Sequence, residues 1–576
     1  MTVTARIIDE LTTDVTVMLY WSVDSSVYQQ DVYPHHDPNS YTGLAMADDG
    51  HHGDGEAGDE VYGAQIPPQV DGTIIELYLQ ASDIDNNTRT WPAPSIVDSV
   101  PEQVTNLLYQ VDESFDPNWV PGNQPIYYLI MTEQEEERLK DIGDGGGGEE
   151  WTDAQMNATF ISVDGTDIKI RYNVGVRNRG HGSRHEPPMN YRVNLVHEHP
   201  WKDVTAVNLN SKFAHLQWLG SATFGMAGMA APDAIIIQVR VNGQNLILSD
   251  SRAHGSYVHY EEKNSEWAEN HFPDDDDGNI YRCIRDGEQA DLRYEGPDPD
   301  AYRDTYFKNT NEEIDDWNDL INLCYVLNNA PDETYLEDVS EVINIKQWMR
   351  YLALDTLLLN CESGLNTGLG DDYALYCGVE DSRFVLVPHD QDTYLIQGDH
   401  KECVETHDIF TFAQVDGLYR LLNHPDTVPL YYQAFFDLFS MVYNPQVMYP
   451  LMQEYLGGYL PQSIIDDMND VVVGRREYVL SQIPRQLTVN CSLPVVDGYY
   501  QSTDGFSVLL SGESHAAKTR SVLVNGIEAE WNARYATWSL DNLPLNPGIN
   551  NIIVQAFDAK EGGGNEIEHV SLDIWY

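Results

Sequence analysis

Two aspartates stand two positions apart directly after a predicted strand. Residues 383–387 (RFVLV) alternate as in a buried strand, which Pro388 ends, and Asp390 and Asp392 follow. Side chains at positions i and i+2 of an extended chain point the same way, so both carboxylates can reach one Mg²⁺. Two like charges this close are costly unless a cation or a proton lies between them. The pair is typical of metal-dependent phosphoryl transfer, although such pairs also arise by chance in an acidic chain.

A glycine-rich loop upstream adds further carboxylates. The apolar helix predicted at residues 345–360 runs into the loop CESGLNTGLGDD, after which residues 374–377 (ALYC) begin a strand. This strand is predicted to pair with residues 383–387 across the turn GVEDS, which brings the loop near the two aspartates. One amide and up to five carboxylates would then surround a single point: Asn360, Glu362, Asp371, Asp372, Asp390 and Asp392. Accidental crowding is the alternative, but the mouth of a hairpin behind a long apolar helix favours a site.

The scarce basic residues gather around a short loop that contains two glycines. In the segment VGVRNRGHGSRHEPPMNYRVNL, Arg177 and Arg179 share one face of a predicted strand. Ser183 and Arg184 follow in the loop, and Arg192 lies on the next strand. Backbone amides of a glycine loop and neighbouring guanidinium groups bind phosphate well, which indicates a phosphate site. The alternative is that these arginines form salt bridges with the acidic surface.

Another acidic loop, DDGHHGDGEAGDEVYG, runs from Asp48 to Gly63. Its glycines allow the loop to turn carboxylates inward, and Ca²⁺ takes six to eight oxygen ligands at about 2.3–2.6 Å. The candidate calcium ligands are Asp48, Asp49, Asp54, Asp59 and Glu60. A solvated hairpin loop is the alternative, because the spacing does not match an EF-hand. His51 and His52 would be ligands only for a transition metal.

The composition limits the kinds of partner. Among 576 residues, 93 are acidic and 32 are basic, so the net charge is −61. A chain of this length exceeds one hydrophobic core, and about two to four domains are expected. The negative charge is spread along the whole chain, which argues against nucleic acid and anionic membranes as partners. It indicates either adaptation to a salt-rich medium or a chain that carries divalent cations.

Cysteines and apolar segments give further constraints. The six cysteines form no CxxC pair, so a structural zinc site is not expected, and Cys361 and Cys377 flank one loop and are the first pair to test for a disulfide. No window reaches the roughly 18 apolar residues that cross a bilayer, so we expect no membrane insertion. The first residues lack the regions of a secretory signal, which fits either a cytoplasmic protein or a mature segment.

The periodicity of apolar residues predicts a multidomain protein, with a central α+β domain between two all-β domains. Strand patterns predict β-sandwiches of the immunoglobulin or fibronectin type over residues 1–112 and 486–576, with a linker at 113–125. Residues 126–485 begin with long strands and continue with helices, which predicts two lobes. Specific predictions are strands at 15–21 and 73–83, helices at 317–329, 345–360, 429–443 and 461–483, and hairpin turns at Asn242-Gly243 and Asn525-Gly526.

Several separated motifs together resemble one family. The segment GVRNRGHGSR…NYRVNL is similar to the R-x-RG-x-(S/G)-SR…SYR-(I/V) signature of the CotH (spore coat protein H) kinase family. The motifs IIQVRVNGQ, HGSYVHYEE, GNIYRC and GDDYALY…RFVLVPHDQD follow in the order of that family. The resemblance covers about residues 126–484. It implies an atypical, secreted or surface-associated protein kinase of two-lobed architecture, which transfers phosphate from ATP to protein hydroxyls.

The resemblance also implies roles for individual residues. The nucleotide would contact Arg179, Ser183, Arg184, Arg192 and Glu262. In this interpretation the Mg²⁺ ligands are Asp390, Asp392 and Asp372, and the catalytic residues are Glu362, Asp371 and Asp390. The chain departs from the family at two places. Pro188 and Met189 stand where members usually carry a lysine, and Glu362 stands where a catalytic aspartate is expected.

Functions of different classes follow from these observations. The first is a CotH-like kinase that uses ATP with Mg²⁺ on an unknown protein substrate. The second, motivated by the two departures, is a catalytically weak pseudokinase that acts as a calcium-stabilised structural or adhesive protein, with surface or matrix proteins as partners. A weaker interpretation is carbohydrate binding by Trp531, Trp538 and Tyr500, for which core packing is the alternative. The expected location is extracellular or the cell surface, and a high-salt environment is one explanation of the charge.

Overall fold

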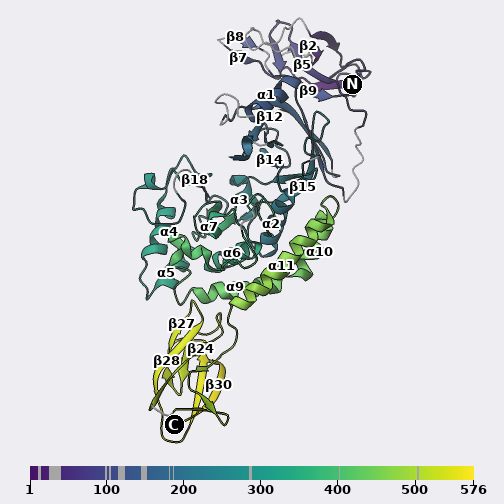
Figure 1. Cartoon of the computed structure of the whole chain (residues 1–576). Helices are drawn as coiled ribbons and strands as arrows, with labels where there is room; N and C mark the ends of the chain where they lie inside the picture. Colours follow the sequence, from purple (N-terminus) through teal and green to yellow (C-terminus); the bar gives the residue numbers. More distant parts are fainter. Residues whose placement is uncertain are drawn as a thin grey trace. The chain divides into compact units, whose positions relative to one another are not determined.

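A computed structural model gives the fold of the chain (Figure 1). It describes residues 1–10, 14–24, 41–97, 100–102, 105–114, 123–143, 152–165, 167–180, 182–185, 187–248, 250–284, 289–400, 403–502 and 505–576. The chain divides into two compact units. Unit 1 comprises Met1–Ala214 and Ala234–Glu262, and unit 2 comprises His215–Asp233 and Lys263–Tyr576. Along the sequence, several β-sheets flank a central α+β region.

Three small sheets form the N-terminal part of unit 1. Their strands are β1 (Thr2–Arg6), β2 (Thr16–Val23), β3 (Thr42–Met46), β4 (Val61–Gln65), β5 (Ile74–Ser82), β6 (Thr88–Trp91), β7 (Ser95–Val97), β8 (Val100–Glu102) and β9 (Leu107–Gln110). The largest sheet has the order β3-β2-β5-β6, with β9 also paired to β5, while β1–β4 and β7–β8 form two-stranded sheets. All of β2 pairs antiparallel with β5. This confirms the strands predicted at 15–21 and 73–83, whose apolar residues, such as Val17 and Ile75, share one core.

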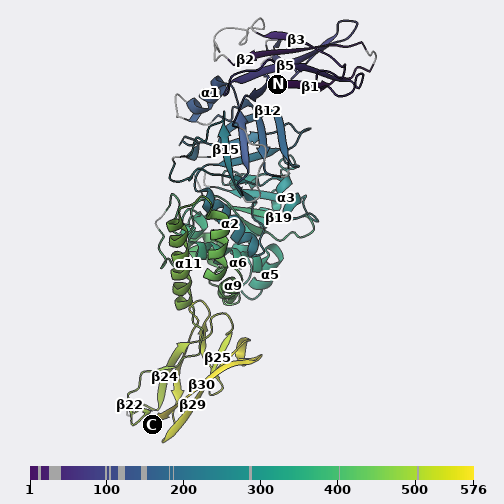
Figure 2. The same ribbon diagram turned by 90° about the vertical axis from the view of Figure 1, so that its right-hand side faces the viewer.

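The rest of unit 1 is a closed barrel of seven strands. They are β10 (Ile126–Ile130), β11 (Met156–Val163), β12 (Ile168–Arg179), β13 (Asn190–Asn194), β14 (Ala206–Asn210), β15 (Ala234–Val241) and β16 (Tyr257–Tyr260), and Figure 2 shows β12 and β15 in blue. The order is β10-β11-β12-β13-β14-β16-β15, and parallel pairing of β10 with β15 closes the ring. Helix α1 (Glu133–Gly143) and the 3-10 turn η2 (Gly182–His185) connect strands of the barrel.

The inner and outer faces of the barrel differ in chemistry. Along β12, Val174, Val176 and Asn178 are buried, and the two valines belong to the barrel core. Because successive side chains of a strand point to opposite faces, Arg177 and Arg179 lie on the outer face. The sequence pattern of β12 therefore places its basic residues on the surface of the barrel.

The predicted turn at Asn242-Gly243 forms, but the second strand of the expected hairpin does not. Both residues have positive φ angles, 48° and 80°, and the amide of Val241 donates to the carbonyl of Gln244. Residues 245–248 form no strand. The physical reason is that β15 already uses both edges, one for β10 and one for β16.

The central part of unit 2 is a four-stranded antiparallel sheet with many helices. The strands, in spatial order, are β18 (Tyr306–Lys308), β17 (Asn279–Cys283), β19 (Tyr373–Cys377) and β20 (Val385–Pro388). The helices are α2 (Ala214–Met226), α3 (Ser265–His271), α4 (Asn318–Asn329), α5 (Tyr335–Val342), α6 (Ile345–Leu358), α7 (Gly364–Thr367), α8 (Asp416–Tyr419), α9 (Val428–Met441), α10 (Pro445–Leu456) and α11 (Gln462–Gln482), with 3-10 turns η3 (Pro299–Ala301) and η4 (Thr411–Gln414). Strands β19 and β20 form the predicted hairpin, with Tyr373 opposite Pro388.

Helix α6 is the buried support of this region. The side chain of Asn344 accepts a hydrogen bond from the amide of Gln347 and caps the helix, and Leu359 ends it with a φ of 56°. All residues from Tyr351 to Leu358 are buried, because α6 packs against α9, α11 and β20. The loop that begins at Asn360 therefore starts from a fixed position.

The predicted helices are confirmed as α4, α6, α9 and α11, whereas α2 and α10 were not predicted. Helix α2 is apolar and rich in small residues, so it carries little helical periodicity. Helix α10 contains Pro450, a residue that normally ends a helix. It is nevertheless formed and packs beside α11, as the green part of Figure 1 shows.

The C-terminal part of unit 2 has two sheets that share one core. The strands are β21 (Asn490–Cys491), β22 (Val495–Val496), β23 (Tyr499–Gln501), β24 (Ser507–Glu513), β25 (Ser521–Val524), β26 (Ile527–Glu528), β27 (Glu530–Asn532), β28 (Thr537–Pro544), β29 (Ile549–Phe557) and β30 (Glu566–Trp575), with the 3-10 turn η5 (Lys560–Gly562). Their orders are β21-β24-β28-β27 and β22-β23-β30-β29-β25-β26. The predicted hairpin turn at Asn525-Gly526 joins β25 to β26. Trp538 is buried, and Trp531 and Tyr500 pack against the same core, so these rings pack internally.

Two further sequence predictions concern the division into domains and membrane insertion. Most of the predicted linker at 113–125 lies outside the described residues, and the four-part domain division stays a prediction beside the two compact units. Within the described residues, no helix combines the length and the apolar character needed to cross a bilayer.

Candidate active site

Two loops of unit 2 carry the predicted acidic residues, and Glu362 connects them. Glu362 follows α6, whereas Asp390 and Asp392 follow β20. The Oε2 atom of Glu362 accepts a hydrogen bond from Thr393 Oγ1 at 3.0 Å, and its carboxyl group is also hydrogen-bonded to Asp392. The Nε2 atom of His400 lies 3.9 Å from Glu362 Oε1. The two loops therefore meet at this glutamate.

The surroundings of Glu362 are strongly negative. Burial raises the pKa of this carboxyl group to about 7, and the charges of Asp390 and Asp372 contribute to the rise, while hydrogen bonds with Asp392 and Thr393 oppose it. The structure thus gathers four of the five predicted carboxylates. A carboxyl group that titrates near neutrality can hold or release a proton at ordinary pH, which is a property of catalytic acids and bases.

The backbone around this group adopts an uncommon conformation. Asp372 and Asp390 have φ angles of 52° and 43°, a region that side-chain-bearing residues rarely occupy outside turns and functional sites. In the same loop, a Cβ atom at Gly364 would stand 1.4 Å from Asp371 Oδ1, so only glycine fits there. Asp371 is itself buried, which places it against the loop backbone.

Asn360 holds the loop together. Its Nδ2 donates to Asp355 Oδ1 at 3.0 Å, and its Oδ1 accepts from the amide of Ser363 at 3.1 Å. Asp355 was not predicted as part of the site. It is buried on α6, and burial raises its pKa to about 7. The signal for this residue was available, because it is an isolated acidic residue within the apolar run of the helix.

The predicted magnesium ligands fit a hydrated cation better than a closed protein cage. Among the described residues, the oxygen atoms of Asp372, Asp390 and Asp392 do not form a group in which three ligand atoms lie within 4.8 Å of one another. Mg²⁺ usually keeps several waters and binds one or two carboxylates together with substrate phosphates. The donor set, carboxylate oxygens around a shared negative region, suits that mode of binding.

The disulfide next to this site differs from the predicted pair. Cys361 is joined to Cys403, not to Cys377. Cys377 belongs to β19 and is a buried free thiol, because pairing in the sheet fixes it away from the loop. Both bonded cysteines are buried beside Leu359. The disulfide therefore fixes the residue that directly precedes Glu362.

The segment after Cys403 is also anchored by a buried arginine. Arg475 of α11 is fully buried, and its guanidinium group donates to the carbonyl oxygens of Thr356, Glu405 and His407. Thr356 lies in the last turn of α6. One cation thus joins α6, α11 and the segment that carries Cys403.

In unit 1, the predicted phosphate-binding residues lie in two rows on the outer face of the barrel. Arg177, Arg192 and Asn208 are register partners on β12, β13 and β14. The Nη1 atom of Arg192 lies 2.8 Å from Glu262 Oε2, which also accepts a hydrogen bond from Asn208. In the second row, Arg179 donates to the side chain of Asn210.

The loop residues Ser183 and Arg184 lie near these rows but have partners of their own. Arg184 and Arg177 both pair with Asp153 Oδ1, at 3.0 and 2.9 Å. Ser183 Oγ accepts a hydrogen bond from Asn190 at 3.1 Å. The salt-bridge alternative is therefore realised for Arg177 and Arg184, which pair with Asp153, and for Arg192, which pairs with Glu262. Arg179 is hydrogen-bonded to Asn210.

Lys212 is a basic residue of unit 1 that sequence reasoning missed. It is only 4% exposed and follows β14 by two residues. The preceding Ser211 donates through its amide and hydroxyl groups to Asn190, which ties this position to the loop of Ser183. The signal in the sequence was the scarcity of lysine, which occurs at only 10 of 576 positions.

The predicted calcium loop forms a compact turn in which aspartate side chains accept hydrogen bonds from backbone amides. Asp54 accepts hydrogen bonds from the amides of Asp49, Gly50 and His52 at 2.7–2.8 Å. Asp48 accepts them from the amides of Gly58, Asp59 and Glu60, and Asp59 accepts one from that of Val61. In the described part of the chain, these carboxylates do not gather three ligand atoms within 4.8 Å. Calcium binding here stays a prediction.

Comparison with known families identifies the region that carries both groups of residues. The family described as CotH kinase protein matches residues 176–458, from β12 to just beyond α10. This part of the chain therefore belongs to the CotH kinase family, as the motifs predicted. The matched segment includes the arginines of unit 1 and the acidic residues of unit 2. No curated protein matches the chain.

Proposed function

We propose that this protein is a Mg²⁺-dependent phosphotransferase, which transfers the γ-phosphate of ATP to a hydroxyl group of a protein. The observation that carries the proposal is the gathering of Asp372, Asp390 and Asp392 around Glu362 inside the segment that matches the CotH kinase family. Phosphoryl transfer needs positioning and charge neutralisation more than covalent chemistry from the protein. An acidic site that holds Mg²⁺ supplies the second requirement.

Individual roles follow from the chemistry of each group. Asp390, with Asp392 and Asp372 beside it, would hold Mg²⁺, which neutralises phosphate charge when it is bound. Glu362 would accept the proton of the attacking hydroxyl group, since its raised pKa makes it a better base than an ordinary carboxylate. Asp371 would support the loop from its buried position beside Gly364.

The arginines of unit 1 are the proposed phosphate contacts. Arg179 and Arg192 are held at the strand surface by Asn210 and Glu262, which fixes their side chains before a nucleotide binds. Guanidinium groups bind phosphate oxygens in bidentate fashion. Arg184 and Ser183 would contribute from the loop if the ion pair with Asp153 exchanges for phosphate.

We further propose that the protein works outside the cell or at its surface, in a medium rich in salt. The Cys361–Cys403 disulfide supports this location, because disulfides persist mainly in oxidising compartments. The charge of −61 supports the salt-rich medium, because dissolved ions screen its self-repulsion. The substrate would be an unidentified protein of that environment.

A phosphate-transfer assay tests the proposed activity. The full chain is incubated with γ-labelled ATP and a mixture of protein acceptors, with Mg²⁺ or with a chelator. We expect label to appear only with Mg²⁺ and to fall at least about 100-fold in Asp390→Asn and Glu362→Gln, the loss typical of a removed catalytic group. Asp381→Asn is the matched control, because Asp381 is exposed in the β19–β20 turn and pairs with Arg383. Absence of Mg²⁺-dependent transfer by the unaltered chain would refute the proposal.

A second candidate function is a pseudokinase that serves as a structural or adhesive protein stabilised by calcium. One observation favours it: Arg177 and Arg184 share the carboxylate of Asp153, and Arg192 pairs with Glu262, so these cations already have anionic partners. Calorimetry with Mg-ATP separates the candidates. Heat of binding that disappears in Arg192→Gln supports the kinase, whereas no heat of binding together with a melting temperature that calcium raises supports the structural role.

A further inference from the structure

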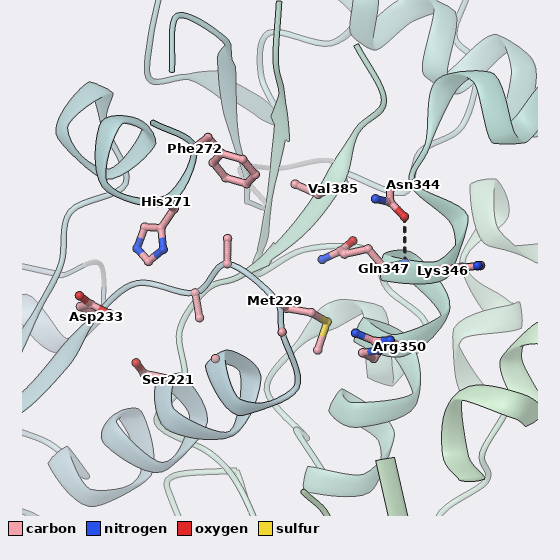
Figure 3. Close-up of a pocket in the computed structure, with 14 residues that line it drawn as sticks. Ser221, Met229, Asp233, His271, Phe272, Asn344, Lys346, Gln347, Arg350 and Val385 are labelled. Carbon is pink, nitrogen blue, oxygen red and sulfur yellow. Dashed lines mark hydrogen bonds between the residues drawn. The ribbon is translucent and has the colours of Figure 1, made fainter. Parts of the chain in front are cut away.

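A hollow of about 580 Å³ lies within unit 2, and its lining includes none of Glu362, Asp372, Asp390 and Asp392. Its walls come from α2 and the segment after it, the end of α3, the first turns of α6 and the start of β20 (Figure 3). Asn344 and Arg350 line it at the start of α6, whereas Glu362 follows the end of that helix. At a rise of 1.5 Å per residue, the part of α6 from Arg350 to its last residue, Leu358, spans about 12 Å. The volume is in the range of sites for small organic molecules.

The hollow exists because one wall is built from very small residues. Ser221 and Gly225 are one helical turn apart on α2, and Gly228, Ala230 and Ala231 follow in the next segment. A Cβ atom at Gly225 would meet no atom within 4 Å. Larger side chains at these positions would fill the space, so the sequence itself leaves it open.

Arg350 supplies a positive charge to this hollow. Its Nη1 atom donates to the carbonyl of Ala227 at 2.9 Å, which holds the side chain against the segment after α2. Among the described residues, no carboxylate forms an ion pair with Arg350, although Arg303 and Arg383 each pair with aspartates. A guanidinium group positioned by one hydrogen bond keeps further N–H groups for a carboxylate ligand.

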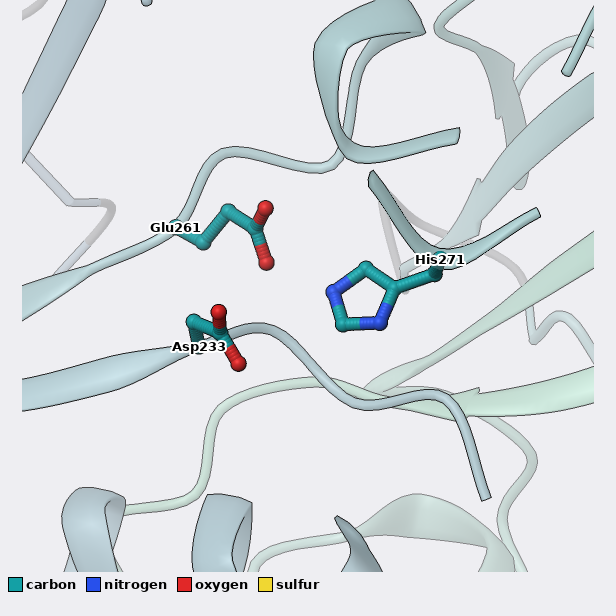
Figure 4. A group of neighbouring side chains, drawn as sticks. All are labelled: Asp233, Glu261 and His271. Carbon is teal, nitrogen blue, oxygen red and sulfur yellow. The ribbon is translucent and has the colours of Figure 1, made fainter. Parts of the chain in front are cut away.

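The other walls are apolar or hydrogen-bonding. Met229, Phe272 and Val385 contribute apolar surface between the two polar ends, as Figure 3 shows. Asp233 and His271 lie at the end remote from Arg350 (Figure 3), and their ligand atoms lie within 4.8 Å of each other (Figure 4). This end suits a hydroxyl group, because a carboxylate accepts its proton and an imidazole takes either role in a hydrogen bond.

We propose that this hollow binds a small amphipathic carboxylate that carries an aromatic or aliphatic body and a hydroxyl group at the far end. The carboxylate would pair with Arg350, the body would lie against Met229 and Phe272, and the hydroxyl group would reach Asp233 or His271. In a chain of net charge −61, general electrostatics repels anions. Binding therefore depends on the local guanidinium group and on burial of the apolar body, which makes the site selective.

The probe for the test is 3-(4-hydroxyphenyl)propionate, titrated into the full chain by calorimetry and by saturation-transfer NMR. Its amide removes the charge, and 3-phenylpropionate removes the hydroxyl group, without any change in the protein. We expect saturable binding of the probe and at least about tenfold weaker binding of the amide, the effect of a lost charged hydrogen bond. We expect a smaller loss for 3-phenylpropionate.

Two substitutions at one position show whether the ligand occupies the hollow. Gly225→Leu fills the space and should abolish binding, whereas Gly225→Ala adds one methyl group where there is room and should keep affinity within about threefold. Arg350→Gln should weaken binding of the probe at least about tenfold, and circular dichroism checks that the variant is folded.

Three results would overturn the proposal. They are equal affinity for the acid and its amide, unchanged binding in Gly225→Leu, and no saturable binding of the probe up to about 10 mM. None of these measurements requires phosphate transfer. The binding proposal and the proposed kinase function can therefore fail independently of each other.

Discussion

At the scale of single residues, Glu362 has the most unusual environment of the candidate site. It is hydrogen-bonded to Thr393 and Asp392, it precedes a buried loop, and its pKa is raised to about 7 by burial and by neighbouring negative charges. A carboxyl group whose pKa is raised on folding favours the folded state only while it is protonated. The residue therefore lowers the stability of the protein without metal at neutral pH, which is a usual property of functional sites.

This environment predicts that the effect of Glu362→Gln on the stability of the protein depends on pH. The folded pKa of about 7 exceeds the ordinary value of 4.5, so the stabilising proton is fully bound below about pH 4.5 and lost as the pH rises through 7. Glutamine mimics the protonated form. We expect the variant to be more stable than the unaltered chain at pH 8 in a chelator, by up to about 3 kcal/mol, and equally stable near pH 4.5. Urea unfolding at both pH values measures the difference.

The matched control is Glu341→Gln, because Glu341 is an exposed residue of α5. It should leave the stability unchanged at both pH values. A Glu362→Gln variant that is less stable than the unaltered chain at pH 8 would contradict the crowded negative environment described for this residue.

At the scale of elements, the loop after α6 is fixed from two sides. Arg475 joins the last turn of α6 to the segment of Glu405 and His407, and the disulfide joins Cys361 to Cys403. The loop of Glu362 is thus rigidly attached to a buried helix. Sites built on such supports keep their reacting groups in place better than sites on free loops.

The disulfide predicts sensitivity to reduction. The cross-link joins residues 42 positions apart, and closing a loop of this length stabilises the folded state by about 4 kcal/mol in the chain-entropy description. We expect Cys361→Ser, or treatment with a dithiol reductant, to lower the free energy of unfolding of the central region by about 2–4 kcal/mol. Urea unfolding with and without reductant measures this, and mass spectrometry of unreduced peptides identifies the bond.

Cys491→Ser provides the comparison, since Cys491 is a partly exposed free cysteine in β21. That variant should keep its sensitivity to reductant, whereas Cys361→Ser should lose it. If reductant changes the free energy of unfolding of neither the unaltered chain nor Cys491→Ser, the cross-link does not stabilise the loop.

The elements themselves were predictable where the periodicity was strong. Strands β2 and β5, helices α4, α6, α9 and α11, and the β19–β20 hairpin all follow from alternation or from three- and four-residue spacing. Helix α2 lacked that signal because small residues replace its polar face, and α10 because it contains Pro450. The barrel was not predictable, because the parallel pairing of β10 with β15 joins segments distant in sequence.

The sequence predicted which residues form the candidate site better than it predicted which residues they contact. The carboxylates near Glu362 gathered because a hairpin and a helix end bring them together, and both were visible in the sequence. The partners were not visible: Asp153 pairs with Arg184, and Cys403 replaces Cys377 as the partner of Cys361. Such pairings depend on loop positions, which periodicity does not determine.

At the scale of the whole molecule, charge is the dominant property. The 93 acidic residues exceed the 32 basic ones threefold, and most ion pairs are at least partly exposed, so each contributes little to stability. The remaining repulsion among like charges opposes the compact state. Dissolved salt reduces this repulsion, because the screening length falls from about 10 Å at 0.1 M to about 3 Å at 1 M.

We therefore expect NaCl to stabilise the protein. Raising its concentration from about 0.1 to about 1 M should increase the melting temperature by at least about 3 °C, which corresponds to about 1 kcal/mol for a domain of ordinary size. Scanning calorimetry measures the change. Glycerol at equal osmolality is the control, because it acts through solvent exclusion without screening charge. A fall in melting temperature with NaCl would show that ion pairs outweigh repulsion.

The order of strands in the barrel has a consequence for biosynthesis. Ile126 of β10 pairs with Gln238 of β15, about 110 positions later, so the ring stays open until β15 and β16 have left the ribosome. At 5–20 residues per second this interval lasts roughly ten seconds, during which β10 exposes an unpaired edge to other nascent chains. The speed of translation across this stretch, together with any chaperone that covers the edge, therefore determines how much of the newly made protein avoids aggregation.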